Sequence, residues 1–268
     1  MPRKIPKSLF DADFRWLWRS SRRFIAKPLQ VTSTTRKSNH FCGGPPPHKG
    51  SKCPKCKKQL TLLWDLDLND ELIPDYVREG FSPATRLPLY ICWQCLAASY
   101  VVLSETRINC FPFVDSQVDY LQENESPFQD SPEEVERRPI SLSRIPSTIE
   151  ALLSLSDVVG FDEFDKPAQT TLKQFFKTKI RSDGDLPISQ FGGSPLVNQG
   201  HGNNVCPNLK CPASTLNHPY GEMTAMFLMK ELALIHWKDE PALTQHCIQL
   251  LYSVCGICFS LQAEYRCS

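Results

Sequence analysis

Paired cysteines carry most of the chemistry that this chain of 268 residues could perform. Cys53 and Cys56 are followed, after 35 intervening residues, by Cys92 and Cys95. Two residues between the members of a pair let both thiolates point at one ion, and two such pairs supply the tetrahedral sulfur shell of a zinc ribbon. A disulfide would need an oxidising compartment, and a thioredoxin-like redox motif would need a single pair opening a helix. The spacing therefore predicts a structural zinc site.

A second set of four cysteines lies near the carboxyl end. Cys206 and Cys211 have four residues between them, Cys255 and Cys258 have two, and 43 residues separate the pairs. These spacings also suit zinc, so we predict two structural Zn²⁺ ions per chain. Four thiolates close the metal's shell and leave no position for water or substrate. None of the six histidines forms a metalloprotease or deaminase motif with these cysteines, so we predict that the protein is not an enzyme.

Four cysteines remain outside these sets: Cys42, Cys110, Cys247 and Cys267. Their simplest role is that of small buried hydrophobes. Cys247 follows His246 and lies near the second set, so a substituted ligand set is an alternative. Cys110 and Cys267 each follow the closing pair of their half, by 15 and 9 residues, either through a shared origin or by accident.

The two cysteine sets belong to a pattern that occurs twice. Gly43-Gly44-Pro45-Pro46 precedes the first set, and Gly192-Gly193-Ser194-Pro195 precedes the second. The offset between equivalent positions grows from 149 residues at the glycines to 163 at the last cysteine pair. We predict that each glycine pair forms a strained turn or a close approach of strands. The fold class predicted is α+β, with internally duplicated antiparallel sheets and zinc-ribbon-like four-cysteine knuckles.

Hydrophobic patterning locates the elements between these motifs. Strands are predicted at residues 60–68, 87–91, 98–103, 223–231 and 248–254. Helices are predicted within residues 1–30, at 149–160 after the capping-box pattern Ser147-Thr148-Ile149-Glu150, and at 165–180. Residues 31–41 are predicted as a loop, 69–83 as a loop or short helical turn, and 122–138 as an exposed linker. The resulting organisation has four parts: a basic arm with one helix (1–41), a first zinc-ribbon-like repeat (42–114), an acidic linker and helical connection (115–185), and a second repeat (186–268).

Charge is distributed unevenly along the chain. Residues 1–60 contain 15 Lys and Arg against two Asp, whereas residues 61–160 contain 6 basic and 17 acidic side chains. The basic head could dock on the acidic middle of the same chain, or it could meet nucleic acid or an anionic surface. The nucleic-acid alternative would use the lysines around the first knuckle, with Trp16, Trp18 and Phe41 available for stacking. These lysines are Lys49, Lys52, Lys55, Lys57 and Lys58.

The sequence also bears on where the protein acts. No apolar run approaches the ~20 residues that span a bilayer, so no transmembrane segment is predicted. Arg15, Arg19 and Arg22 interrupt the amino-terminal region, which therefore lacks the apolar core of a signal peptide. We expect a cytoplasmic protein, whose reducing surroundings keep cysteines available to metal.

The carboxyl-terminal motifs resemble the YwqG-like family of uncharacterised proteins. The resemblance is carried by Phe191-Gly192-Gly193-Ser194-Pro195, by Cys206-Pro207, by a strand beginning at Met223 and by the closing cysteine pair. This chain departs from the family pattern in lacking Trp after Pro195 and in its longer Cys206–Cys211 spacing. The resemblance implies an α+β fold with internal duplication. The family has no established enzymatic activity, so the resemblance does not decide the function.

Together these features predict a non-enzymatic, zinc-stabilised protein-interaction module with an unknown protein partner. The alternative is a nucleic-acid-binding zinc-ribbon protein that uses its basic amino-terminal region.

Overall fold

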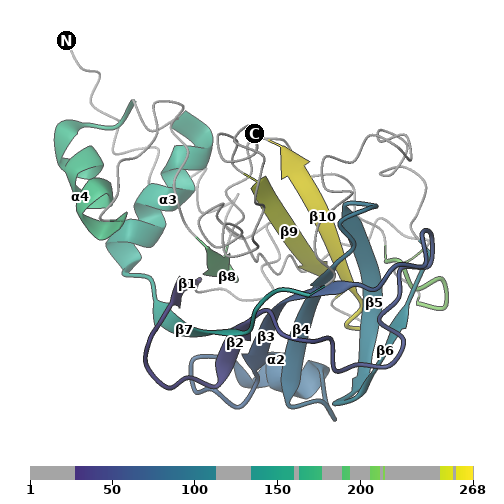
Figure 1. Ribbon diagram of the computed structural model, residues 1–268. Helices are drawn as coiled ribbons and strands as arrows, with labels where there is room; N and C mark the ends of the chain where they lie inside the picture. Colours follow the sequence, from purple (N-terminus) through teal and green to yellow (C-terminus); the bar gives the residue numbers. More distant parts are fainter. Residues whose placement is uncertain are drawn as a thin grey trace.

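The computed structural model describes residues 28–112, 134–159, 163–176, 189–193, 206–211, 214, 248–255 and 258–267. The helix predicted within residues 1–30, the strand predicted at 223–231, and Cys247 lie outside the described residues, apart from Pro28 to Gln30. The described chain is mostly β-structure, with two antiparallel sheets and few helices (Figure 1).

The larger sheet has six strands, in the order β4-β3-β2-β7-β1-β8. They are β1 (Leu29–Ser33), β2 (His40–Cys42), β3 (Thr61–Asp67), β4 (Arg86–Ile91), β7 (Arg138–Arg144) and β8 (Gln190–Phe191). Every pairing in this sheet is antiparallel. Because β8 pairs with β1, the segment just before the second cysteine set lies beside the first described strand of the chain.

The smaller sheet has four strands, in the order β6-β5-β10-β9. They are β5 (Ala97–Ser104), β6 (Arg107–Cys110), β9 (Ile248–Val254) and β10 (Leu261–Cys267). The strands predicted at 60–68, 87–91, 98–103 and 248–254 are confirmed as β3, β4, β5 and β9. The smaller sheet thus combines strands from both halves of the chain.

Strand β3 shows why these residues form a central strand. Six of its seven residues are buried, including Leu62, Leu63, Trp64 and Leu66. A strand buried on both faces reads as a continuous apolar run. Its one buried charge, Asp65, is paired: Arg86 Nε on β4 donates to Asp65 Oδ1 over 2.6 Å.

The loop prediction at 31–41 is wrong, and strand β7 was not predicted. Residues 31–41 contain most of β1 and the start of β2, and β7 begins at the end of the predicted 122–138 linker. Strand β7 lies between β1 and β2 and pairs with both. Its sequence, Arg138-Pro-Ile-Ser-Leu-Ser-Arg144, is polar on alternate positions, and only Ile140 is fully buried. Long-range pairing, rather than local hydrophobicity, makes this segment a strand.

The two helices predicted at 149–160 and 165–180 are confirmed, the first beginning two residues earlier and the second ending four residues earlier. Helix α3 (Ser147–Val159) and helix α4 (Lys166–Phe176) pack on each other beside the larger sheet (Figure 1). Asp165 Oδ1 accepts a hydrogen bond of 2.8 Å from the amide of Ala168 and caps the start of α4. Within residues 69–83 a short helix forms, α2 (Asp75–Gly80).

The two repeats meet at equivalent residues. Strands β4 and β5 flank the first closing cysteine pair, as β9 and β10 flank the second. In the smaller sheet, β5 pairs with β10 so that Ser99 lies opposite Gln262. These two residues are 163 positions apart, the same offset that relates Cys92 to Cys255. Buried tyrosines add a further link, since Tyr252 Oη donates to the carbonyl of Tyr90 over 3.1 Å.

Both glycine pairs adopt the backbone conformation that the repeat pattern predicted. Gly43 and Gly44 have φ of +71° and +105°, and Gly192 and Gly193 have φ of +83° and +79°. A Cβ at Gly43 would lie 2.5 Å from the carbonyl oxygen of Glu136, and one at Gly193 would lie 2.7 Å from Cβ of Pro28. Only glycine combines this backbone with such close approach, which explains why both copies have it.

Candidate metal centres

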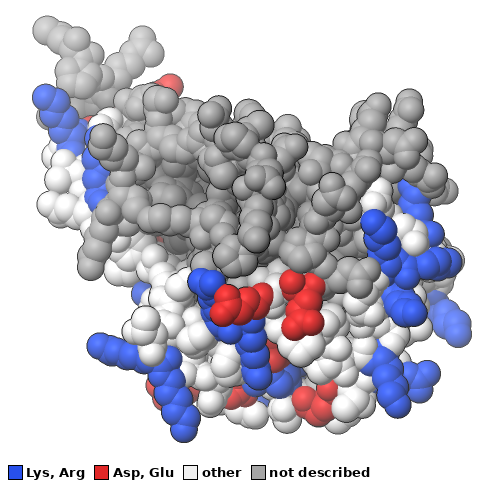
Figure 2. All heavy atoms as spheres, viewed as in Figure 1, with Lys and Arg blue, Asp and Glu red and all other residues white. Residues whose placement is uncertain are grey.

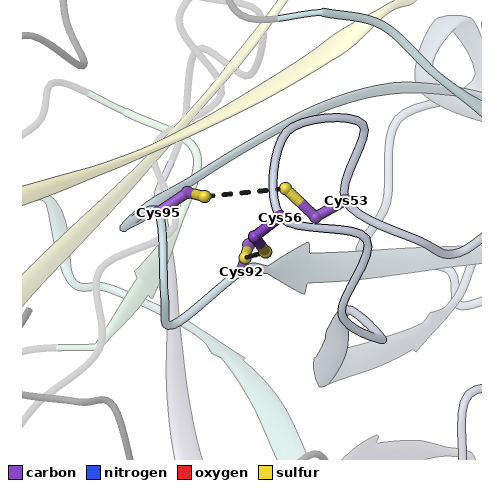
Figure 3. Close-up of side chains that lie close together, drawn as sticks. All are labelled: Cys53, Cys56, Cys92 and Cys95. Carbon is purple, nitrogen blue, oxygen red and sulfur yellow. Dashed lines mark hydrogen bonds between the residues drawn. The ribbon is translucent and has the colours of Figure 1, made fainter. Parts of the chain in front are cut away.

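The first knuckle is a tight loop between β2 and β3. The amide of Cys53 donates to the carbonyl of Lys58 over 2.9 Å, and the amide of Lys57 donates back to the carbonyl of Cys53 over 3.0 Å. Lys57 has a φ of +64°, the left-handed conformation that turns the chain after the second cysteine. The loop holds both thiols on its inner side (Figure 3).

The second knuckle of this site joins β4 to β5. The amide of Cys92 donates to the carbonyl of Ala97 over 3.1 Å, and Leu96 has a φ of +52°. The knuckle at Cys255 repeats this geometry. Its amide donates to the carbonyl of Ser260 over 2.8 Å, and Phe259 has a φ of +55°. Three of the four knuckles therefore share one backbone turn, as the duplication predicted.

The four sulfur atoms of the first site have the spacing of a zinc shell. Cys53 Sγ lies 3.7 Å from Cys95 Sγ, and Cys56 Sγ lies 3.4 Å from Cys92 Sγ. All four sulfurs lie within 4.8 Å of one another and point toward a common centre (Figure 3). A tetrahedron with Zn–S bonds of ~2.3 Å has edges of about 3.8 Å, so these residues fit the ion. Disulfide bonds, at about 2.05 Å, are not formed among the described cysteines.

The second site has the same arrangement with one irregular knuckle. Cys206 Sγ lies 3.4 Å from Cys258 Sγ, and Cys211 Sγ lies 3.8 Å from Cys255 Sγ. The two additional residues between Cys206 and Cys211 are accommodated by Asn208. Its carbonyl accepts from the amide of Cys211 over 2.8 Å, and its Oδ1 accepts from the amide of Lys210 over 3.1 Å. An Asx turn thus replaces the shorter knuckle.

The thiols of the first site differ strongly in pKa. Hydrogen bonds from Cys92 and Cys95 lower the pKa of Cys53 to about 2. The hydrogen bond to Cys53 is also the main reason that the pKa of Cys92 is raised and that of Cys95 is raised to about 12. A metal ion must displace these protons before it can use all four sulfurs.

In the second site, burial and hydrogen bonding oppose each other. Burial raises the pKa of Cys206. Burial also acts to raise the pKa of Cys258, but hydrogen bonds from Ser260 and neighbouring thiols outweigh it and lower this pKa to about 7. Ser260 Oγ lies 3.0 Å from Cys258 Sγ. Sequence reasoning missed Ser260, although its position two residues after a ligand is a usable signal.

The remaining cysteines that can be placed are not ligands. Cys42 is buried in the main core. Burial raises the pKa of Cys110 to about 12, and its thiol donates to the carbonyl of Gly50 over 3.2 Å. Cys110 lies in β6 and Cys267 lies in β10, the counterpart of β5. Their similar distances from the closing pairs therefore do not reflect equivalent positions.

The five lysines of the nucleic-acid alternative lie together around the first knuckle. Lys49, Lys52, Lys55, Lys57 and Lys58 are all exposed. Phe41, suggested as a stacking residue, lies in β2, where the guanidinium of Arg137 lies 3.6 Å from its ring centre. Trp16 and Trp18 lie outside the described residues.

Comparison with known proteins adds no relative to these observations. No protein-family model, curated protein or solved structure matches the chain. The resemblance to the YwqG-like family stays a prediction from its motifs. No helix in the described part of the chain combines the length and apolar character needed to cross a membrane.

Proposed function

We propose that this chain is a non-enzymatic protein-interaction module whose two zinc ions hold its binding loops in place. The observation that carries the proposal is the pair of four-cysteine clusters with tetrahedral sulfur spacing. Zinc in an all-thiolate shell has no open position at which to activate water or substrate. Its contribution is instead to folding, because binding to the native state adds directly to stability.

A protein partner is favoured by the outer side of the Cys206–Cys211 loop, the opening knuckle of the second site. Leu209 occupies its tip and is 79% exposed. An apolar side chain on a metal-fixed loop is pre-organised for burial by a partner, which lowers the entropic cost of association. The adjacent Lys210 is also exposed, so the tip combines an apolar anchor with a charged neighbour.

The proposal is tested by site-specific photo-crosslinking in the source cells. A photoreactive residue at position 209 should capture a defined protein, whereas one at the exposed Thr35 in the β1–β2 connection should not. Capture should be lost when Cys255→Ser removes the second-site ligand. Equal capture at both positions would count against the proposal. So would a catalytic activity of the purified protein that requires its zinc.

The second candidate is nucleic-acid binding, favoured by the exposed lysines of the first knuckle. None of the five forms an ion pair with a carboxylate of the described residues. Unpaired cations gathered on one loop are the electrostatic footprint expected of a polyanion-binding surface. Anisotropy measurements with labelled oligonucleotides over a salt series distinguish this candidate, since affinity should fall steeply as salt rises.

A further inference from the structure

Arg107 adds a sixth cation to the cluster of five lysines, although it is distant from them in sequence. Lys49 and Arg107 lie side by side, because the amide of Lys49 donates to Thr106 over 2.8 Å and the amide of Ile108 donates to Lys49 over 3.0 Å. Arg107 is exposed and lies in β6, far from the knuckle in sequence. We call Lys49, Lys52, Lys55, Lys57, Lys58 and Arg107 the basic ridge.

The basic ridge is visible as a concentration of charge. Figure 2 shows Lys and Arg side chains at the edge of the molecule where Figure 1 places β5 and β6, with no Asp or Glu among them, whereas further Lys and Arg in the middle of the view lie beside Asp and Glu. Glu105, two residues before Arg107, accepts a hydrogen bond from the amide of Thr85. The described fold thus places the ridge's charges together without pairing them to carboxylates.

The backbone beneath the ridge is held rigidly. Lys57 and Lys58 take part, through their backbones, in the two hydrogen bonds that close the first knuckle. The backbone of Lys52 forms an antiparallel β-bridge with that of Gln59. The side chains of two lysines have neutral acceptors. Lys57 Nζ donates to the carbonyl of Pro54 over 2.5 Å, and Lys58 Nζ donates to Gln94 Oε1 over 3.1 Å. Since an ammonium has three donors, both remain able to bind an anion.

The second metal site shows that zinc itself does not require these lysines. A zinc ion with four thiolates carries a net charge of about −2, so nearby cations could serve only to balance it. The second site would carry the same charge, yet its opening knuckle contains one lysine, Lys210, whereas residues 52–58 contain four. The additional cations of the first knuckle are therefore available for a ligand.

The form of the ridge indicates what that ligand is. Lysine binds phosphate as a point charge, and a row of lysines on a rigid loop suits a repeating anion. Base stacking needs an exposed aromatic ring. Among the described residues the exposed large hydrophobic side chains are Tyr76, Leu103 and Leu209, and none belongs to the ridge. The six ridge residues, which include no aromatic ring, offer contacts to a phosphate backbone and none for stacking on bases.

We propose that the basic ridge binds the phosphate backbone of double-stranded nucleic acid without reading or stacking its bases. This inference rests on the second candidate function and specifies its ligand and its surface. A duplex is favoured because it carries one charge per ~1.7 Å, a higher density than a single strand. Each lysine that neutralises a phosphate should add about 0.9 to the slope of log affinity against log salt.

The test uses the full-length, zinc-loaded chain and measures fluorescence anisotropy between 50 and 200 mM salt. The probes are a mixed-sequence DNA duplex, an RNA duplex and a dT single strand of equal length. The variant is Lys52→Gln/Lys55→Gln/Lys58→Gln. The matched control, Arg36→Gln/Lys37→Gln/Arg144→Gln, removes three exposed cations around β1, β2 and β7. Zinc content and melting temperature verify that both variants fold.

The ridge variant should bind the duplexes more than about tenfold more weakly at 0.15 M salt, with the salt slope reduced by about 2 to 3. The control should change affinity less than about threefold, because its charges lie in or beside β1, β2 and β7 of the larger sheet and outside the ridge. Duplex should bind more tightly than single strand. Tighter binding of the dT single strand than of the duplexes would contradict binding without base stacking. Equal losses of duplex affinity in the two variants would contradict the assignment of binding to the ridge.

Two further outcomes separate this inference from the function beneath it. If no oligonucleotide binds the unmodified chain at 50 mM salt, the nucleic-acid function itself fails. If oligonucleotides bind but the ridge variant binds equally well, the function stands and the ridge is the wrong surface. Anionic phospholipid vesicles, measured at the same salt, provide the last arm. Binding to vesicles that exceeds binding to duplex would replace nucleic acid with a membrane surface.

Discussion

In the first metal site, Cys53 and Cys92 belong to the same buried cluster as Trp64 and Leu89, whereas among the described residues the cysteines of the second site form a separate small cluster. The first site therefore shares its packing with the centre of the larger sheet. The second site joins a loop to the hairpin of β9 and β10. Among the described residues, the two sites thus differ in the packing around them, and we expect the first site to contribute more to the stability of the larger sheet.

That difference teaches how a duplicated metal site can diverge. Both copies keep the ligands, the glycine pair and the closing knuckle. The opening knuckles differ: the first contains four lysines, and the second contains two more residues between its cysteines and an exposed leucine. Changes accumulate on the outer side of the loops because the inner side is constrained by the metal shell.

Removal of both zinc ions gives the largest effect and tests the comparison directly. Structural zinc contributes about 10–16 kcal/mol, which equals or exceeds the typical total stability of about 5–15 kcal/mol. A competing chelator should therefore remove zinc in two phases, the second-site ion first, with most loss of β-structure in the second phase. Zinc release and far-ultraviolet circular dichroism, recorded together, provide the measurement. Release in one phase would show that the sites are not independent.

Single ligand changes sharpen the comparison. Cys92→Ser and Cys255→Ser should each lower the zinc content by about one ion, from two. Cys92→Ser should lower the melting temperature by about 10–20 °C, the shift that corresponds to about 5 kcal/mol, because it disrupts the main core. Cys255→Ser should lower it by less than half as much. Elemental analysis and calorimetry under reducing conditions measure both. Equal shifts would contradict the assignment of the first site to the core.

The pH dependence of zinc binding follows from the pKa shifts in the metal-free clusters. The pKa of Cys92 and that of Cys206 are raised, and the pKa of Cys95 is raised to about 12, so these thiols are protonated at neutral pH. Zinc must displace those protons, so affinity rises with pH and is lost as pH falls. At the first site at least two protons leave, which predicts about a hundredfold change in affinity per pH unit near neutrality. Competition with a chromophoric chelator from pH 6 to 8 measures it. A pH-independent affinity would mean that the thiols are already ionised.

The smallest effect concerns the contact between α2 and the second site. A Cβ at Gly80 would lie 1.8 Å from a ring carbon of Phe259, which packs on Phe81 with ring centres 5.4 Å apart. Gly80→Ala should cost about 1–3 kcal/mol through this overlap and weaken zinc at the adjoining Cys258. Glu79→Ala, at an exposed position of the same helix, is the control and should change stability by less than about 0.5 kcal/mol. Equal behaviour of the two variants would show that the ring moves aside freely.

The two four-cysteine groups could be predicted from the sequence because a tetrahedral ion would impose short spacings that are visible along the chain. Strand β3 could be predicted for a similar reason, since its burial leaves a continuous apolar run. Strand β7 was missed because its alternation, Ile140-Ser141-Leu142-Ser143, is short and lies between arginines, and because its partners β1 and β2 lie about 100 residues away. The same limit applies to Arg107, which joins the basic ridge only through its pairing with Lys49.

The pairing of Ser99 with Gln262 gives the smaller sheet the form of an isologous dimer interface, in which the same edge is used by both partners. A chain with one copy would expose the edge of β5, and an unpaired strand edge is a template for association with other molecules. Joining two copies covalently replaces that association with an intramolecular one, at an effective concentration on the order of millimolar. The sheet can therefore close at any protein concentration, and its vulnerable edge is covered by the same chain that carries it.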